Sequence, residues 1–256
     1  MIGIFDSGSG GLTVLAPLRK QLPSADIVYF GDIKNAPYGV RSQEELTRLT
    51  VEAIKLLRKE GATHIVSACN SVSASLSLSL FGMMELAPDR LIEMIGPTVA
   101  SLRDSEERLL LCATPATIRS GIYQSAFGMV GKDIGTLAIP ELAGAIEAGE
   151  GPEKIESIIR NVLVSVDTAA FDALTLSCTH YPLVADIFTQ VLPCHIRLID
   201  PGEAVAARVA HDWSGEQSGA GKTRFLISQD SESFRGLVAQ LLPEETHTIE
   251  VVSPQA

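Results

Sequence analysis

The sequence predicts an α/β protein with mainly parallel sheets. Short apolar runs alternate with longer segments of helical periodicity along the whole chain, as expected when helices connect parallel strands. With 256 residues, the chain is long enough for one large domain or two domains of roughly 100 to 150 residues each. Its two halves are organised alike, and each contains a strand-like run that ends in a cysteine.

The elements follow one another in a regular order. The strand-like runs are residues 2–5, 27–30, 64–68, 91–95, 109–113, 137–139, 173–176, 196–199, 224–228 and 248–252. Helical periodicity fits residues 12–21, 42–59, 152–166 and 231–242, and a further helix ends at Trp213. The clearest helix start is Ser42, because Glu45 three residues later completes a capping box. Gly96-Pro97-Thr98 predicts a junction that crosses into a second domain.

Charge and composition argue against several classes of partner. The chain has 20 basic and 31 acidic residues, a net charge of −11, and only 5% aromatic residues. An acidic surface repels nucleic acid and anionic membranes. We therefore expect neither partner. Since no membrane-spanning run or signal peptide is visible, we expect a cytoplasmic protein. A small anionic substrate is compatible with this charge, because backbone N–H groups and helix ends bind anions locally.

The four cysteines, Cys69, Cys112, Cys178 and Cys194, are widely spaced and form no Cys-x-x-Cys pair. Neither a zinc site nor a disulfide framework is indicated. We expect free thiols and no bound metal. Cys112 lies within an apolar run, where a cysteine usually acts as a small hydrophobic residue.

Cys178 and Cys69 each come directly after a predicted strand and before a helical segment. This carboxyl edge of a parallel sheet is where ligands bind in open α/β folds, beside helix ends that favour thiolates. Two thiols that face one substrate can remove a proton from one side of a carbon and return a proton on the other, which inverts a stereocentre. Asp6 and His180 are candidate helpers. Spacing alone does not show that the thiols face each other, and a buried inert cysteine is the alternative for either.

The glycine-rich turn from Asp6 to Gly11 has two interpretations. It is similar to a dinucleotide-binding turn, with Asp32 as a further part of that fingerprint, but Thr13 stands where the third small residue is required. The Asp6 carboxylate is also a poor neighbour for a pyrophosphate. It suits an ammonium group or a thiol better, and a structural cap for the following helix is the alternative. A nucleotide-binding α/β module is therefore the weaker hypothesis.

Six motifs in chain order resemble the aspartate/glutamate racemase superfamily, and within it the glutamate racemases. They are Asp6-Ser7-Gly8-x-Gly10-Gly11-Leu12-Thr13-Val14, Pro37-Tyr38-Gly39, Cys69-Asn70-Ser71, Thr114-x-x-Thr117 with Ser120 and Tyr123, Cys178-Thr179-His180-Tyr181-Pro182-Leu183, and Ile199-Asp200-x-Gly202. The match covers nearly the whole chain, and the two cysteine motifs are its most specific part.

The resemblance implies two similar parallel-sheet α/β domains with the active site in the cleft between them. Residues 1–95 plus 206–256 would form the first domain and residues 96–205 the second. It also implies a homodimer, glutamate as substrate, no pyridoxal phosphate or other cofactor, no metal, and a cytoplasmic role in supplying D-glutamate for peptidoglycan.

The resemblance also implies roles for single residues. Cys69 would take the proton from D-glutamate and Cys178 the proton from L-glutamate. Asp6 and His180 would assist them, and Glu147 falls in the segment where the family carries a third such group. The positions similar to the family's substrate contacts are Ser7, Pro37, Tyr38, Gly39, Asn70, Ser71, Thr114, Thr117 and Thr179.

Three positions depart from the common family pattern. Ser71 replaces a frequent threonine, Ile139 precedes Pro140 where cysteine is frequent, and Pro201 replaces a frequent serine. None of the departures removes a catalytic group, but they allow a changed substrate preference. An aspartate racemase of the same superfamily and a non-catalytic amino-acid-binding protein are the alternatives to a glutamate racemase, and retention of both thiols, Asp6 and His180 argues against the second.

Overall fold

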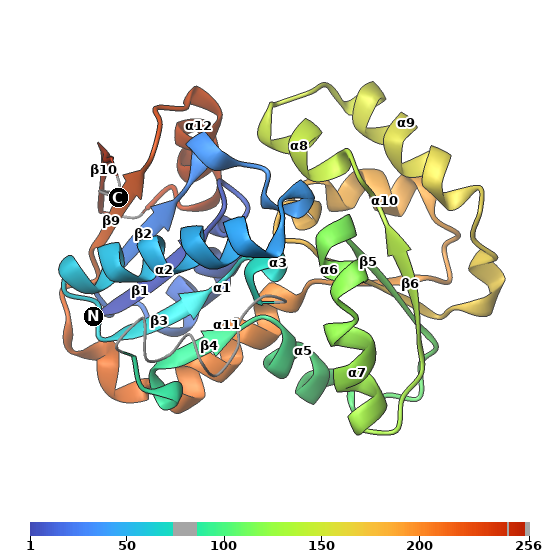
Figure 1. Ribbon diagram of the computed structural model, residues 1–256, viewed down its shortest axis with the longest axis horizontal. Helices are drawn as coiled ribbons and strands as arrows, with labels where there is room; N and C mark the ends of the chain where they lie inside the picture. Colours follow the sequence, from blue (N-terminus) through green and yellow to red (C-terminus); the bar gives the residue numbers. More distant parts are fainter. Residues whose placement is uncertain (74–85, 245, 254–256) are drawn as a thin grey trace.

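The computed structural model describes residues 1–73, 86–244 and 246–253 of the chain. Two parallel sheets lie side by side, each covered by helices on both faces (Figure 1). The α/β class with parallel sheets is thereby confirmed. The remainder of the helix expected after Cys69 lies outside the described residues.

The first sheet has six strands in the order β10-β9-β2-β1-β3-β4. Its strands are β1 (Ile2–Asp6), β2 (Ile27–Gly31), β3 (His64–Ser67), β4 (Leu91–Glu93), β9 (Thr223–Ile227) and β10 (His247–Val251). The second sheet has four strands in the order β6-β5-β7-β8. They are β5 (Leu109–Ala113), β6 (Ile134–Ala138), β7 (Ala173–Ser177) and β8 (Arg197–Ile199).

Helices cover both faces of each sheet. Around the first sheet are α1 (Leu12–Gln21), α2 (Gln43–Lys59), α3 (Asn70–Ser73), α11 (Pro201–Asp212) and α12 (Glu232–Leu241). Around the second are α5 (Ile95–Leu102), α6 (Pro115–Ser120), α7 (Ile122–Met129), α8 (Leu142–Glu147), α9 (Pro152–Leu163) and α10 (Ala185–Val191). Apolar cores on both faces stabilise each sheet, since burial of apolar side chains is the main favourable term in folding.

The central strands explain where the polar side chains gather. All residues of β1 and β7 are buried, because each strand lies between two neighbours and under helices on both faces. β1 ends at Asp6 and β7 ends at Ser177, so the residues that follow them emerge at the carboxyl edges of the two sheets. Parallel pairing therefore places chemically active residues at those edges.

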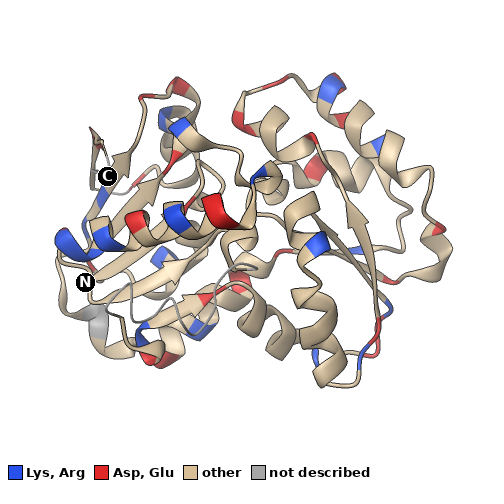
Figure 2. Ribbon diagram, viewed as in Figure 1, with Lys and Arg blue, Asp and Glu red and all other residues tan. Residues whose placement is uncertain are grey.

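Several outer helices carry charged residues of both signs. Figure 2 shows positions of both signs along α2 and α9. Ion pairs one helical turn apart join Arg48 to Glu52 at 2.8 Å and Arg160 to Glu156 at 2.6 Å. Exposed pairs of this kind contribute about 0.3–0.5 kcal/mol each. Among the described residues, no helix is both long and apolar enough to cross a membrane.

The chain departs from the expected elements at one junction. Gly96-Pro97-Thr98 lies inside α5 and is not a loop, and the preceding strand ends at Glu93. The Glu93 carboxylate accepts hydrogen bonds from the backbone N–H groups of Ile95 (2.5 Å) and Gly96 (2.7 Å). A helix can therefore begin there, because its first N–H groups have acceptors and proline is tolerated in the first turn.

Smaller differences concern the ends of elements. β6 begins three residues earlier than expected, at Ile134. Gly135 allows this start, because a Cβ atom there would lie only 2.4 Å from Cζ of Phe171. The capping box of Ser42 and Glu45 is confirmed. The expected domain boundary at 205/206 falls inside α11, whose Val205 and Val209 both pack in the core of the first sheet. How the chain divides into domains remains a prediction.

Candidate active site

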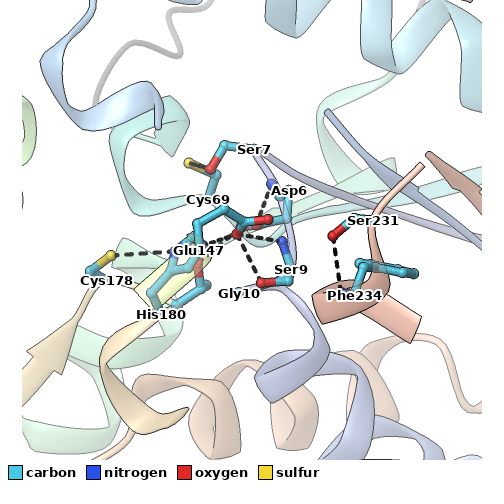
Figure 3. Close-up of polar contacts among 12 residues, drawn as sticks. Asp6, Ser7, Ser9, Gly10, Cys69, Glu147, Cys178, His180, Ser231 and Phe234 are labelled. Carbon is cyan, nitrogen blue, oxygen red and sulfur yellow. Dashed lines mark hydrogen bonds and ion pairs between the residues drawn. The ribbon is translucent and has the colours of Figure 1, made fainter. Parts of the chain in front are cut away.

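Cys69 and Cys178 lie at the carboxyl edges of the two sheets and line one cavity. Cys69 follows β3 and Cys178 follows β7, and each side chain is only 5% exposed. The residues that line the cavity are Ser7, Pro37, Tyr38, Gly39, Cys69, Asn70, Ser71, Thr114, Ala143, Cys178, Thr179 and His180. The structure therefore brings together in one place residues that are far apart in the sequence (Figure 3).

Three expected site residues do not line the cavity but support residues that do. Asp6 and Glu147 lie behind the two thiols and contact Thr179 and His180, respectively. The Thr117 hydroxyl is 3.1 Å from that of Thr114. Ala143 is the one lining residue that the sequence does not indicate, since an alanine carries no chemical signal.

Cys69 lies near an acidic group and is shielded from solvent. Its sulfur lies 3.6 Å from the Ser7 hydroxyl oxygen. Burial, and then the charge of Asp6, raise the pKa of the Cys69 thiol to about 12. Burial likewise raises the pKa of the Asp6 carboxyl, although the charge of His180 acts in the opposite direction. Cys69 and Asp6 therefore both favour their protonated forms on this side of the cavity.

The alternative role of Asp6 as a helix cap is not what the geometry shows. Helix α1 begins after Gly11 without a side-chain cap. Asp6 instead accepts a hydrogen bond from the Gly8 N–H at 2.9 Å and another from the Thr179 hydroxyl at 3.0 Å. It thus stabilises the glycine-rich turn and joins that turn to the second sheet.

The surroundings of Cys178 include a cationic group. Its sulfur lies 3.9 Å from Nδ1 of His180, and Nε2 of the same ring lies 2.5 Å from Oε2 of Glu147. Burial alone would lower the pKa of His180, but its hydrogen bonds with Cys178 and Glu147 prevail and hold that pKa well above its ordinary value. An imidazolium ion is therefore favoured next to this thiol.

Glu147 remains an anion although it is largely buried. Burial would raise its pKa, but the hydrogen bond and charge of His180, followed by two hydrogen bonds from Ser9, lower it overall. The Ser9 N–H lies 3.0 Å and the Ser9 hydroxyl 2.8 Å from Oε2 of Glu147 (Figure 3). Sequence reasoning missed Ser9, because its partner is 138 positions away and no local pattern marks it.

A group of neutral hydrogen-bonding side chains forms another part of the wall. The Tyr123 hydroxyl donates to Oδ1 of Asn70 at 2.6 Å, which fixes the orientation of the amide. Asn70 Nδ2 is buried and has no hydrogen-bond partner among the described residues. The hydroxyls of Ser71 and Thr114 lie 2.9 Å apart. Donors of this type suit the carboxylates of a small substrate, and an unpaired buried donor is costly unless a ligand satisfies it.

The glycines of the first turn allow two loops to approach closely. A Cβ atom at Gly8 would lie 2.5 Å from Oε2 of Glu147, and one at Gly10 would lie 2.5 Å from the Thr179 hydroxyl oxygen. Asp32 accepts hydrogen bonds from Asn35 and from the Tyr38 hydroxyl. Protein groups thus occupy the space beside the turn, and the turn does not form a pyrophosphate site. The nucleotide-binding hypothesis therefore loses its structural basis.

Within the described residues, no group of three or more His, Cys, Asp or Glu side chains is arranged to hold a metal ion. The arrangement that the structure does show is a pair of buried thiols with separate acid–base groups behind them. Such a pair can exchange protons with a carbon atom held between the two sulfurs.

Comparison with known proteins identifies the family. The model of the family described as Asp/Glu/Hydantoin racemase matches residues 13–209. The chain belongs to the Asp/Glu/hydantoin racemase family. This racemase is 33% identical to the glutamate racemase of Desulforudis audaxviator, with 97% of this chain and 96% of that protein covered. It is 34% identical to the glutamate racemase of Aquifex aeolicus, with 95% and 94% covered.

Solved structures agree with this assignment. The glutamate racemase of Francisella tularensis in complex with D-glutamate superimposes on this racemase with a TM-score of 0.85 and 28% identity, covering 99% of this chain and 97% of that one. The aspartate racemase of Picrophilus torridus gives a TM-score of 0.60 at 20% identity, covering 83% and 94%. The second likeness is evidence for the fold alone.

Proposed function

We propose that this racemase interconverts L- and D-glutamate without a cofactor, through Cys69 and Cys178. The observation that carries the proposal is that both thiols line one cavity, with different acid–base groups behind them. The curated relatives named glutamate racemase, which match over nearly the full length, support glutamate as the substrate.

The mechanism requires the two thiols to be in opposite protonation states. With D-glutamate bound, the Cys69 thiolate removes the α-proton and the Cys178 thiol delivers a proton to the opposite face. With L-glutamate, Cys178 removes the proton and Cys69 delivers one. Each turnover moves one proton onto one sulfur and one proton off the other, so atoms and charges balance.

The groups behind the thiols adjust these states. On the Cys178 side, the His180 imidazolium, paired with Glu147, lies beside the sulfur and can give it a proton and take that proton back. On the Cys69 side, the raised pKa of the thiol favours the protonated form until the substrate brings its ammonium group into the cavity. Asp6 can then accept or return a proton.

The substrate's carboxylates need donors that the cavity supplies. The unpaired Nδ2 of Asn70 and the hydroxyls of Ser71 and Thr114 are suited to one carboxylate. Ser7 lines the cavity beside Cys69, and its hydroxyl is suited to the other; Thr179 lines the cavity beside Cys178, where its hydroxyl donates to Asp6. Pro37, Tyr38 and Gly39 form the wall at Thr114, where a Cβ atom at Gly39 would lie 2.6 Å from Cβ of Thr114.

The wider role follows from the reaction. D-glutamate is a component of peptidoglycan, and supply of this amino acid in the cytoplasm by a homodimer without a metal or other cofactor is part of the same proposal. Its support is the family relationship, since the relatives match over nearly their whole length.

The test is α-proton exchange in heavy water. The protein is incubated separately with L- and D-glutamate, and the α-proton is followed by NMR together with the optical rotation. Exchange with loss of rotation from both enantiomers is the expected result. Exchange of aspartate but not glutamate would identify an aspartate racemase. Binding of glutamate without exchange or racemisation of either amino acid would identify a binding protein.

A further inference from the structure

Ser9 connects the glycine-rich turn of the first sheet to the acid–base pair of the second. It is only 1% exposed, and nothing in the motif pattern gives it a role. Its N–H and its hydroxyl both donate to Oε2 of Glu147, at 3.0 and 2.8 Å. The same oxygen lies 2.5 Å from Nε2 of His180 (Figure 3). Three donors therefore converge on one carboxylate oxygen.

We propose that Ser9 is a positioning residue for the Cys178 half of the reaction: its hydroxyl holds Glu147 ionised and aligned with His180, which in turn faces Cys178. This inference rests on the proposed racemisation and deepens it. Ser9 does not line the cavity and acts through Glu147 and His180, so it is distinct from the residues that contact the substrate.

Hydrogen bonds to an ionised carboxylate favour its ionised form and are stronger than those between neutral groups. Loss of the Ser9 hydroxyl would leave the buried carboxylate with two donors in place of three. Its proton affinity would rise, and the His180 imidazolium would lose part of its counter-charge. The ring of His180, whose Nδ1 lies 3.9 Å from the Cys178 sulfur, would then be held less firmly in line with that sulfur.

The Ser9 hydroxyl is the part of this contact that a substitution can remove without changing the backbone. Gly8 approaches the carboxylate so closely that a Cβ atom would lie 2.5 Å from Oε2. The Ser9 N–H belongs to the backbone and persists in every variant. Replacement of Ser9 by alanine therefore removes one donor and leaves the turn itself in place.

Other titratable groups lie near the Glu147–His180 pair, and any pH dependence of the activity must take them into account. They are Asp6 and Tyr29 from the first sheet, Cys69, and Cys178 beside His180. None of them contacts the Ser9 hydroxyl among the described hydrogen bonds. A change confined to the Ser9 hydroxyl therefore reaches the reaction through Glu147.

The test compares S9A and S9T with a matched control, S228A. Ser228 is also a buried serine at the carboxyl end of a strand of the first sheet, and its hydroxyl accepts a hydrogen bond from the Lys34 N–H. We expect S9A to lower kcat/KM about 10- to 150-fold, as loss of a hydrogen bond to a charged group would. S9T keeps a hydroxyl and should restore most of the activity, and S228A should change it by no more than about twofold.

Two readouts separate positioning from a general structural effect. The acid limb of the kcat/KM profile should move to higher pH in S9A, because the activity requires ionised Glu147 and its pKa rises. Because the enantiomers have equal free energies, kcat/KM must fall equally in both directions. The asymmetry should appear in isotope effects, which should rise for L-glutamate deuterated at Cα and fall for the D-enantiomer.

The outcomes are distinct. Wild-type protein without α-proton exchange would contradict the proposed racemisation itself. Active wild-type protein, together with an S9A variant whose acid limb and two isotope effects are unchanged, would overturn the role of Ser9 alone. Thermal melting of S9A confirms that the comparison is made on folded protein.

Discussion

The two thiols of the site are equally buried, at 5% exposure each, but their neighbours are opposite in charge. Cys69 has a serine hydroxyl at 3.6 Å and the carboxyl of Asp6 behind it. Cys178 has the imidazole of His180 at 3.9 Å, paired with Glu147. A cysteine thus follows one strand in each sheet, but the two cysteines have different neighbours.

Unequal surroundings allow one cavity to give two equally buried thiols different roles. A two-base reaction needs one sulfur protonated and the other not. Burial and a neighbouring carboxylate favour the protonated form of Cys69, whereas Cys178 lies beside the cationic His180.

Removal of the His180 cation should have the largest effect on racemisation. We expect H180N to lower racemisation about 10²- to 10³-fold, because proton transfer by a positioned side chain contributes on this order. H211N is the matched control. His211 is exposed at the end of α11, and its replacement should change activity by about twofold at most. A loss of activity in H211N equal to that in H180N would contradict the special role of His180.

The two thiols should also differ in chemical reactivity. In a C194S background, which removes the exposed cysteine, we expect iodoacetamide to modify Cys69 about 10-fold more slowly than Cys178 at pH 7, because the raised pKa of Cys69 keeps it protonated and the thiolate is the reactive species. Peptide mass spectrometry measures both rates in one sample. Equal rates, or faster modification of Cys69, would contradict the expected difference between the two thiols.

The ion pair on the Cys178 side should give stability a specific pH dependence. Glu147 has a lowered pKa, so its contribution is complete above the unfolded value and is lost as pH falls through the folded value. His180 has a raised pKa, so its contribution is complete below about 6.5 and is lost as pH rises through the folded value.

The pair should therefore stabilise the fold most between about pH 4.5 and 6.5. We expect E147Q to lower the free energy of unfolding by about 3–5 kcal/mol in that window, with the difference decreasing at more alkaline pH. Urea unfolding of wild type and E147Q at several pH values measures it. A difference that grows at alkaline pH would contradict the assignment.

Local signals predicted most of the fold. Alternation of strands and helices predicted the parallel sheets, and the Ser42–Glu45 pattern predicted a capping box that the structure contains. The start of α5 was missed, because its cap is the Glu93 side chain at the end of the preceding strand. A Gly-Pro pair alone is typical of a loop, and only the neighbouring carboxylate makes it a helix start.

Local sequence patterns predicted less of the site than of the fold. Strand-end positions singled out Cys69 and Cys178, but only the resemblance placed them face to face. Glu147 came from the resemblance as well. Ser9 was missed altogether, because a contact across 138 positions between two sheets depends on how those sheets pack.

The most direct test of the whole account is α-proton exchange by the single-thiol variants C69A and C178A. Each is incubated in heavy water with L- or D-glutamate, and exchange and optical rotation are followed together. We expect that neither variant racemises, that C69A exchanges only L-glutamate and that C178A exchanges only D-glutamate, each with retention. Racemisation by either variant, or exchange of both enantiomers by one of them, would contradict the division of work between the two thiols.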